Sequence, residues 1–368
     1  MKHATSGGTV KLRMMIAGGG TGGHLFPGIA LAEAARRRDP ETAILFVGNA
    51  RGIESRVVPT SGFDLALLPG APLRGRKVAG QVTALGALGA ATVRARALVQ
   101  RFAPDVVVGL GGYASAPAVV AGRLRRLPIV LLEQNAKPGM TTRFLARLAD
   151  RVCVSFPDTA AGFAAGQAVV TGNPVRAFAV ATDLGTVRSG LTIAIVGGSA
   201  GAHRLNEAGP ELRAALADIP GLAIIHQTGF ADEAAVRAGY AGAPGIDVRP
   251  FITDMGAVYA AADLIICRAG ATTIAELAAQ GLPAIFVPYP HAADDHQRAN
   301  AEALVRGGAA RLVLDYQATG TRLAEEVRDV VTTPNLLAEM RHRMRQFARP
   351  DAASRVLAVI DELVAGKR

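Results

Sequence analysis

Short runs of β-branched and other apolar residues alternate with longer Ala-rich amphipathic segments along the first half of the chain. The apolar runs are nearly continuous, which is typical of parallel strands covered on both faces. The segments between them, such as Pro27–Arg38 with its proline at a plausible first-turn position, favour helices. The strands predicted in this half are Arg13–Ala17, Ala43–Val47, Val106–Val108, Ile129–Leu132, Val152–Val154 and Val169–Thr171. This alternation predicts a doubly wound α/β domain.

The same alternation starts again after a polar, glycine-containing stretch at residues 183–190. The strands predicted in this half are Leu191–Val196, Ala223–Gln227, Leu264–Cys267, Pro283–Val287 and Arg311–Leu314. Each half opens with a strand that runs into glycines, so the same unit is predicted twice. We therefore expect two domains, residues 1–173 and 174–350. A last helix, Asp351–Val364 within residues 351–368, is expected to pack back on the first domain.

Composition supports two packed cores in a chain of 368 residues, since 50% of them are hydrophobic and 19% are charged. Cys153 and Cys267 each lie in an apolar run, which predicts buried strand thiols in a reducing compartment. Residues 1–10 have no apolar core of signal-peptide length, and no apolar run reaches about 18 residues. We therefore expect a cytoplasmic protein without a spanning helix.

The formal net charge of +10 indicates either an anionic partner or a bias of composition toward Ala and Arg. Nucleic acid, an anionic membrane surface and an anionic small substrate are the partners that fit such a charge. The sequence has no RNA-binding signature and no stripe of interleaved aromatic and basic residues. No nucleic-acid partner is therefore expected.

The first predicted strand runs into the glycine pattern Gly18-x-Gly20-x-x-Gly23. Glycines allow the backbone to approach a pyrophosphate, and a following helix N-terminus stabilises its negative charge. An NAD-binding domain would also need an acidic residue at the end of the second strand, which ends at Asn49 instead. The pattern therefore predicts a diphosphate-binding turn and disfavours an NAD-linked oxidoreductase. His24, directly after the turn, is either structural or a general base.

A second glycine turn, Gly197–Gly201, carries Ser199 at its tip. It predicts N–H groups and a hydroxyl facing a nucleotide phosphate, with a plain tight turn as the alternative. Farther along, Thr272 or Thr273 is expected to cap a helix whose N-terminus favours an anion. Glu276 in that helix either complements the helix dipole or accepts hydrogen bonds from ribose hydroxyls. Its place near the carboxyl end of a strand favours the ribose.

The connection at residues 288–300 is unusually polar for a loop that leads into a helix. A metal site at His291 and His296 is disfavoured because positions i and i+5 lie on different sides of a helix and no third ligand is apparent. Hydrogen bonds from Gln297 and Asn300 to sugar hydroxyls are chemically easier.

The sequence contains no Asp-x-Asp triplet of the kind that often holds a nucleotide-sugar diphosphate through a divalent ion. The charge of a departing nucleotide would then be met by helix N-termini and by Arg176. No metal ion and no cofactor are expected.

Val78–Val93 is an uncharged, largely apolar stretch between basic flanks. It is short for a bilayer span, but a basic-flanked apolar segment can lie in the membrane interface. An ordinary domain helix with arginines at its solvent end is the alternative. The expected membrane-contact residues are Arg74, Arg76, Lys77, Val78, Val82 and Leu85.

Taken in order along the chain, these motifs resemble the MurG family of peptidoglycan N-acetylglucosaminyltransferases. The resemblance runs from about residue 12 to the C-terminal region. The matching blocks are Gly19–His24, Phe26–Gly28, Gly111–Ser115, Glu133–Asn135, Gly172–Arg176, Gly197–Ser199, Phe251–Ile252, Cys267–Glu276 and Asp295–Gln297. Two positions depart from the family pattern: Ala200 stands where Gln is common, and Leu132 where His is frequent.

The resemblance implies a GT-B fold, in which two Rossmann-like domains with doubly wound parallel sheets face a cleft and the second binds most of the donor. The implied contacts of UDP-GlcNAc are Thr21, Gly22, Gly23, Asn135, Arg176, Ser199, Ile252, Ala271, Thr272, Thr273, Glu276 and Gln297. The implied contacts of the acceptor diphosphate are Gly22, Gly23, His24, Gly112, Tyr113 and Ser115. Within the donor site, Ile252 and Arg176 are implied at the uracil and Glu276 at the ribose.

The implied reaction is a single displacement with inversion at the anomeric carbon of GlcNAc. The 4-hydroxyl of N-acetylmuramic acid on an undecaprenyl-pyrophosphate carrier (lipid I) attacks the donor and yields lipid II and UDP. His24 is the expected base and Glu133 the alternative. The expected place is the cytoplasmic face of the membrane, as a peripheral protein, with other cell-wall synthesis proteins as further partners.

Two rival functions share part of this pattern. Another GT-B transferase with a different lipid acceptor would have the same fold. A nonenzymatic nucleotide-binding subunit is disfavoured by the paired polar loops, which suit two substrates.

Overall fold

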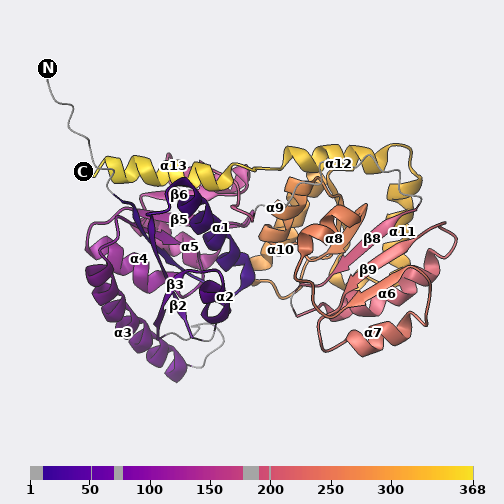
Figure 1. Cartoon of the computed structure of the whole chain (residues 1–368), viewed down its shortest axis with the longest axis horizontal. Coiled ribbons are helices and arrows are strands. Elements are labelled where there is room, and N and C mark those ends of the chain that lie inside the picture. Colours follow the sequence, from indigo (N-terminus) through magenta and orange to yellow (C-terminus); the bar gives the residue numbers. More distant parts are fainter. Residues whose placement is uncertain (1–10, 51, 70–77, 177–189, 199, 368) are drawn as a thin grey trace, which may run out of the picture. The chain divides into compact units, whose positions relative to one another are not determined.

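The computed structural model describes residues 11–50, 52–69, 78–176, 190–198 and 200–367, with the side chains of residues 78–85 and 87 left out. The chain divides into two compact units, each with its own parallel sheet (Figure 1). Unit 1 comprises Met1–Gln134, Pro138–Arg176 and Asp351–Arg368, and unit 2 comprises Asn135–Lys137 and Ala177–Pro350. The fold class is therefore the predicted one, two α/β domains with parallel sheets.

The sheet of unit 1 has the strand order β3-β2-β1-β4-β5-β6-β7, with all neighbours parallel. Its strands are β1 (Arg13–Ala17), β2 (Ala43–Asn49), β3 (Asp64–Leu68), β4 (Val106–Gly109), β5 (Ile129–Glu133), β6 (Arg151–Val154) and β7 (Ala168–Val170). Its helices are α1 (Gly22–Arg38), α2 (Glu54–Thr60), α3 (Val78–Phe102), α4 (Ser115–Leu124), α5 (Met140–Leu145) and α13 (Ala352–Ala365).

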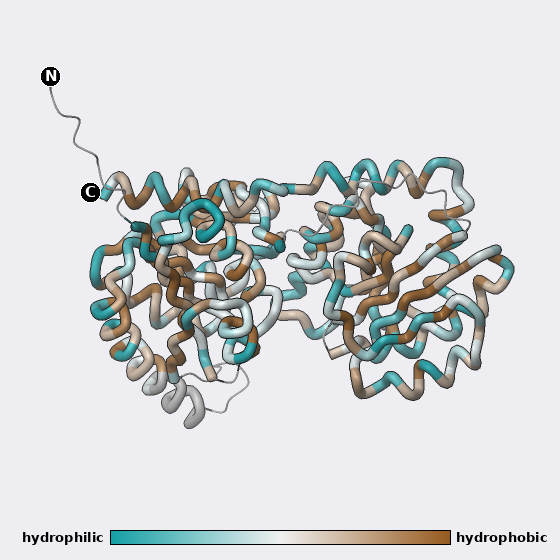
Figure 2. The backbone as a smooth tube through the Cα atoms, in the orientation of Figure 1, coloured by the Kyte–Doolittle hydropathy of each residue, from teal (hydrophilic) through white to brown (hydrophobic). Residues whose placement is uncertain are grey.

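Both faces of this sheet are buried, which explains the continuous apolar runs of the sequence. Because successive strand residues point to opposite faces, Met14 and Ile16 pack with α1 and α13. Met15 and Ala17 pack on the other side with α3 and α4. Figure 2 shows the same pattern, with the hydrophobic colour concentrated along the strands.

The sheet of unit 2 has the strand order β10-β9-β8-β11-β12-β13, again with all neighbours parallel. Its strands are β8 (Thr192–Val196), β9 (Ala223–Gln227), β10 (Ile246–Arg249), β11 (Leu264–Cys267), β12 (Ala284–Phe286) and β13 (Ala310–Leu312). Its helices are α6 (His203–Ala215), α7 (Glu233–Gly239), α8 (Met255–Ala261), α9 (Ala271–Gln280), α10 (His296–Arg306), α11 (Gly320–Thr332) and α12 (Leu336–Gln346).

The sequence pattern missed two strands, β3 and β10, and both lie at an edge of a sheet. Charged residues interrupt the apolar runs of these two strands, whereas the other two edge strands, β7 and β13, were predicted. Asp64 is exposed at the start of β3, and Asp247 and Arg249 form an ion pair on β10. The rule that finds buried parallel strands therefore does not find these two.

The predicted start of the first helix is wrong. Pro27 lies inside α1 and not in its first turn, because the helix begins five residues earlier at Gly22. Thr21 is the N-cap residue with extended backbone angles, so the glycine turn leads directly into the helix. As a result, His24 belongs to the first turn of α1.

Helix α13 returns to unit 1 after the chain has completed unit 2. It contacts α1, and its Val356, Leu357 and Ile360 join the core on that face of the sheet. Asp361 accepts a hydrogen bond of 2.6 Å from Arg38 at the surface. Unit 1 is thus closed by the last helix of the chain.

The stretch predicted to contact a membrane forms the beginning of α3. Arg74, Arg76 and Lys77 lie outside the described residues, and at Val78, Val82 and Leu85 only the backbone is described. Farther along the helix, Ala91, Ala95 and Val99 are buried in the core of unit 1. None of the helices in the described part of the chain is long and apolar enough to cross a membrane.

Both cysteines are buried free thiols, as predicted, on β6 and β11. Unit 2 also contains a buried histidine: His226 on β9 is fully shielded from solvent. Its ring nitrogens lie 2.8 Å from the hydroxyl of Tyr240 and 3.1 Å from the side-chain oxygen of Asn206. Because burial disfavours the charged ring, the pKa of His226 falls from 6.5 to about 4.

This histidine predicts a loss of stability at acidic pH. Between pH 6.5 and about 4 the unfolded chain binds a proton that the native ring does not. The free energy of unfolding therefore falls as pH falls, by up to about 1.4 kcal/mol per pH unit, and the full contribution is present above pH 6.5. Urea unfolding of wild type and His226→Gln at pH 7.5 and pH 5 measures this change in the free energy of unfolding. We expect wild type to lose about 2 kcal/mol more than the variant.

The exposed His342 provides a control, because His342→Gln should leave the wild-type pH dependence unchanged. An equal loss of stability in wild type and in His226→Gln would contradict the prediction.

Candidate active site

The strand order of each sheet reverses next to its first strand. In unit 1, β1 lies between β2 and β4, and in unit 2, β8 lies between β9 and β11. Open parallel α/β sheets bind their ligands outside the carboxyl ends of the strands at such a switch point. The two glycine turns lie there: Gly18–Gly23 follows β1, and Gly197–Gly201 follows β8.

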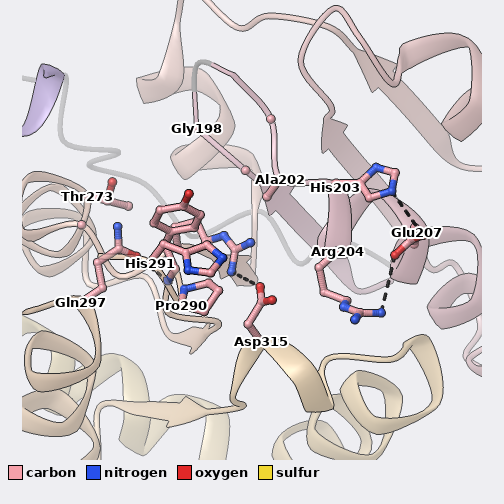
Figure 3. A pocket seen from close by; sticks show the side chains of 15 residues that line it. Gly198, Ala202, His203, Arg204, Glu207, Thr273, Pro290, His291, Gln297 and Asp315 are labelled. Carbon is pink, nitrogen blue, oxygen red and sulfur yellow. Dashed lines mark hydrogen bonds and ion pairs between the residues drawn. The ribbon is translucent and has the colours of Figure 1, made fainter. Parts of the chain in front are cut away.

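Unit 2 has a pocket of about 560 Å³ at its switch point (Figure 3). Its walls come from the turn between β8 and α6, the turn between β11 and α9, and the loop after β12. In Figure 3, Thr273 and Gln297 lie on one side, and His203, Arg204 and Glu207 on the other. Glycine backbone, a hydroxyl, an amide and charged groups line it, which suits a polar, anionic ligand.

The glycine turn of unit 2 needs its glycines for close packing. Gly198 and Gly201 have φ values of +90° and +79°, which side chains rarely adopt. A Cβ on Gly201 would lie 1.9 Å from the carbonyl oxygen of Thr228, so the turn sits against the loop after β9. Ser199, predicted to bind a phosphate, lies outside the described residues.

The N-terminus of α9 forms another wall of this pocket. The prediction that Thr272 or Thr273 caps the helix is wrong: Gly270 is the N-cap residue, without a side-chain cap, and both threonines fall in the first turn. Ala271 and Thr272 are buried, whereas Thr273 lines the pocket. A helix N-terminus without a side-chain cap leaves N–H groups for an anion.

Gln297 presents its amide nitrogen to a ligand. Its Oε1 accepts hydrogen bonds from the N–H of Tyr289 at 2.9 Å and of Ala269 at 3.2 Å. Two backbone donors on one atom identify that atom as the oxygen. The side-chain NH₂ of Gln297, which lines the pocket, is therefore a hydrogen-bond donor toward it.

The cations of the pocket are paired with acids. Arg268 donates to Asp315 at 2.5 Å and to the carbonyl oxygen of Val287 at 3.0 Å. Across the pocket, Glu207 lies 3.3 Å from His203 and 3.6 Å from Arg204. The hydrogen bond to Asp232 and the charge of Glu207 raise the pKa of His203.

Three further predicted donor residues of unit 2 are not among the residues that line this pocket. Glu276 accepts a hydrogen bond of 2.8 Å from the hydroxyl of Tyr259, which is buried. Ile252 is 7% exposed and follows β10. Asn135 belongs to the short segment that joins unit 2, where its Oδ1 accepts from Asn300 at 3.2 Å.

Asn300 itself is a structural residue and not the predicted sugar ligand. It is fully buried, and its side chain accepts from the N–H of Ala136 at 2.7 Å. Its amide nitrogen donates to Asn135 and, at 3.1 Å, to the carbonyl oxygen of Ala269. Asn300 therefore holds Asn135 next to the turn between β11 and α9.

In unit 1, His24 contacts the end of the sheet through Gln134. Its Nδ1 lies 3.2 Å from Oε1 of Gln134, whose nitrogen donates to the carbonyl oxygen of Leu110 at 3.3 Å. That second bond orients the amide, so its oxygen faces the ring and Nδ1 carries the proton. In the neutral ring the lone pair then lies on Nε2, the nitrogen able to accept a proton.

Glu133 has a different environment, although it is adjacent to Gln134. It is 2% exposed, and its Oε2 accepts a hydrogen bond of 3.0 Å from the N–H of Gly139. The carboxylate thus holds the loop that leads into α5. This structural role is enough to explain why the Glu133 carboxylate is buried, and it requires no function in proton transfer.

The predicted acceptor residues after β4 form a second turn beside His24. Gly111 and Gly112 have φ values of +87° and +70°, and a Cβ on Gly111 would lie 3.2 Å from Nδ1 of His24. Ser115 is buried at the start of α4 and donates 2.8 Å to the carbonyl oxygen of Gly112. Tyr113 is exposed. The turns after β1 and β4 therefore meet at His24.

Arg176, predicted at the nucleotide, belongs to unit 1, where its guanidinium lies 4.5 Å from the centre of the Phe26 ring. Phe26 lies in α1, two residues after His24. The structure thus groups Arg176 with the first glycine turn. The described residues contain no group of three or more His, Cys, Asp or Glu side chains able to hold a metal ion.

The predicted site omitted Gln134 and Arg268, although both lie inside motifs that the sequence singled out. It also omitted Glu54, whose buried carboxylate lies beneath the first glycine turn. Neighbouring motif positions pointed to the first two. No sequence signal linked Glu54 to a turn more than thirty residues away.

Comparison with known proteins agrees with this geometry. Residues 14–154 match the glycosyltransferase family 28 N-terminal domain, and residues 192–356 match the glycosyltransferase family 28 C-terminal domain. Among solved structures, the crystal structure of Acinetobacter baumannii MurG is similar, with a TM-score of 0.79 and 35% identity. The similarity covers 95% of this chain and 99% of that one.

Two relatives carry the name UDP-N-acetylglucosamine–N-acetylmuramyl-(pentapeptide) pyrophosphoryl-undecaprenol N-acetylglucosamine transferase. The protein from Geobacter sp. (strain M21) is 44% identical over an alignment of 355 residues that covers 95% of this chain and 95% of that protein. The protein from Geobacter sulfurreducens is 42% identical over 367 residues, covering 97% and 99%.

Proposed function

This chain belongs to the MurG family of glycosyltransferases. We propose that it transfers GlcNAc from UDP-GlcNAc to undecaprenyl-pyrophosphoryl-MurNAc-pentapeptide. The product is lipid II, the precursor of peptidoglycan, and the chain is a hexosyltransferase. The single observation that carries the proposal is the sequence identity of 42–44% between this chain and transferases of that name, over nearly the whole length of the chain. The polar switch-point pocket of unit 2 supports it independently.

We assign UDP-GlcNAc to unit 2. The turn with Ser199 and the first turn of α9, Ala271–Thr273, would contact the phosphates through N–H and hydroxyl groups. Ile252 and Glu276 would hold the uracil and the ribose. The amide orientation of Gln297 and the fixed position of Asn135 support their assignment to the GlcNAc hydroxyls.

We assign the acceptor diphosphate to the two turns of unit 1. Thr21, Gly22 and Gly23 open α1, whose N-terminus favours negative charge, and His24 beside them is left for the acceptor hydroxyl. Gly112, Tyr113 and Ser115 come from the adjacent turn into α4. Arg176, stacked on Phe26 of α1, would add a positive charge on this side.

In the reaction, Nε2 of His24 takes the proton of the MurNAc 4-hydroxyl. The hydroxyl oxygen forms a bond to the anomeric carbon of GlcNAc, the bond from that carbon to the UDP oxygen breaks, and UDP leaves with the electron pair. Glu133 stays the less favoured base because its carboxylate is buried against Gly139. Helix N-termini and Arg176 would stabilise the charge on UDP.

Release of UDP from UDP-GlcNAc with a lipid I analogue tests the function. We expect turnover with the analogue and none in a lipid-free control. Turnover should persist in EDTA, because helix N-termini and Arg176, without a divalent ion, are proposed to stabilise the charge on UDP. Transfer to diacylglycerol but not to the lipid I analogue would point to a transferase with another lipid acceptor.

We also propose that unit 1 contacts an anionic membrane surface, where a lipid-linked acceptor would lie. Exposed large apolar residues alternate with exposed arginines on its helices: Leu124 lies beside Arg123 and Arg125, and Phe144 beside Arg143. Apolar side chains flanked by cations suit the interface of an anionic bilayer. The protein would then be peripheral to the cytoplasmic face.

Sedimentation with phosphatidylglycerol vesicles tests the membrane proposal. Binding should be strong at low salt and fall at high salt, because exposed charges are screened. Leu124→Glu combined with Phe144→Glu should weaken binding about 10-fold or more, since each buried large apolar side chain contributes about 1.5–3 kcal/mol. The matched control in unit 2 is Phe230→Glu, also at an exposed phenylalanine. No wild-type binding to these vesicles would refute the proposal.

A further inference from the structure

Glu54 is a buried carboxylate with no part in the reaction described above. It begins α2, is 1% exposed, and accepts hydrogen bonds from two backbone N–H groups. The N–H of Gly20 lies 2.8 Å from Oε2, and the N–H of Asn49 lies 2.9 Å from Oε1. The carboxylate therefore ties the first glycine turn to the end of β2.

Three glycines make room for this carboxylate. A Cβ on Gly19 would lie 2.5 Å from Oε2, one on Gly48 would lie 2.4 Å from Cγ, and one on Gly52 would lie 2.0 Å from Oε2. Gly19 comes from the turn after β1, Gly48 from the end of β2, and Gly52 from the turn before α2. Part of the glycine content of this region thus serves Glu54 and not a ligand.

The contact also changes which part of the turn can bind an anion. The N–H of Gly20 points to Glu54, so it does not face the acceptor. The diphosphate contacts are left to the residues that follow, beginning with Thr21, the N-cap residue of α1. Gly20 has a φ of +87°, in a region that glycine adopts readily. A small backbone rotation at Gly20 would therefore reorient the N–H groups that follow it.

We propose that Glu54 is a positioning residue for the acceptor: its carboxylate holds Gly20 so that the N-terminus of α1 faces the acceptor diphosphate. The inference rests on the proposed function, which assigns that diphosphate to this turn. The diphosphate is remote from the bond that forms, so its contacts act equally in the ground state and the transition state. Losing their alignment therefore raises the acceptor KM more than it lowers kcat.

Glu54→Gln is the direct test. The amide has nearly the size of the carboxylate but keeps only one acceptor oxygen, so one of the two backbone N–H groups meets an NH₂ donor. We expect the acceptor KM to rise about 10-fold, as for the loss of one charged hydrogen bond, with the UDP-GlcNAc KM within about 2-fold of wild type. Steady-state kinetics with each substrate varied in turn measures both.

A purely structural role gives a different result. Partial unfolding would lower apparent kcat through the amount of active enzyme and leave both KM values unchanged. Removal of a negative charge near an anion site would, if repulsion dominated, lower the acceptor KM. Either result would overturn the proposal, as would an equal rise of both KM values.

Two further variants sharpen the test. Gly52→Ala displaces the carboxylate without removing its charge and should raise the acceptor KM in the same way, which covers the case of a poorly folded Glu54→Gln. The matched control is Glu211→Gln in unit 2, since Glu211 also accepts from a backbone glycine, Gly320, at 2.9 Å. It should leave both KM values unchanged.

Wild-type activity distinguishes a failure of the role of Glu54 from a failure of the proposed function. Transfer by wild type together with a normal acceptor KM in Glu54→Gln and Gly52→Ala removes Glu54 from acceptor positioning and leaves the function intact. A wild type that fails to transfer GlcNAc to the lipid I analogue refutes the proposed function, and this inference with it.

Discussion

His24→Ala is expected to lower turnover about 10²–10⁴-fold, the usual contribution of a general base. The reason lies in the ring environment: Gln134 accepts from Nδ1, so the free lone pair of the neutral ring is on Nε2. Alanine leaves no group in the first turn of α1 to take the proton of the acceptor hydroxyl. Donor affinity should change little, because the proposed donor groups belong mostly to unit 2. Transfer kinetics with a lipid I analogue and calorimetry with UDP measure the two effects.

Two variants show whether the loss belongs to the base. Gln134→Met keeps the side-chain volume but removes the acceptor for Nδ1–H of His24. The ring can then rotate and change its tautomer. We expect turnover to fall about 10-fold, less than in His24→Ala. His342→Ala, at an exposed histidine of unit 2, should have wild-type turnover. Near-normal turnover of His24→Ala would exclude His24 as the base and return attention to Glu133.

Glu276→Ala is expected to raise the UDP-GlcNAc KM about 10–100-fold, as for the loss of hydrogen bonds to a charged acceptor. The carboxylate accepts a hydrogen bond of 2.8 Å from the hydroxyl of Tyr259, which fixes its position for the proposed contact with the ribose hydroxyls. The ribose does not react, so the loss should appear in KM more than in kcat. Titration of UDP into the variant by calorimetry measures the same loss without turnover.

Tyr259→Phe and Glu233→Ala are the matched controls. The first keeps the Glu276 carboxylate but frees it from its partner, so the donor KM should rise only a few-fold. The second removes a partly buried surface glutamate that pairs with Arg237 at 2.8 Å and should change neither the donor KM nor kcat. Unchanged UDP affinity in Glu276→Ala would show that the ribose assignment is wrong.

Most of the fold could be predicted because buried parallel strands carry a local signature. Strands such as Arg13–Ala17 and Leu264–Cys267 have the predicted bounds, since both faces of each sheet require apolar residues. Charged residues interrupt the apolar runs of β3 and β10, so these two edge strands were missed, whereas the edge strands β7 and β13 were predicted. The start of α1 was misplaced because proline is usual in a first turn, whereas the glycine turn leads into the helix five residues before Pro27.

The candidate site could be predicted only in part. The glycine turns were found because positive φ angles and close backbone approach demand glycine at given positions. The structural role of Asn300 could not be found, because its partners Ala136 and Ala269 lie 164 and 31 residues away in sequence. For Arg176 the sequence indicated a phosphate contact, while its stacking on Phe26 depends on the packing of unit 1.

The sequence by itself therefore determined the two parallel-sheet domains, the two glycine turns and the family, because these depend on short patterns of residue type. The tertiary structure alone decided which atoms face a ligand. The amide of Gln134 orients His24 from 110 residues away, and Glu54 holds Gly20 from 34 residues away. Hydrogen bonds have direction and short range, so they exist only once the folded chain has brought these groups together.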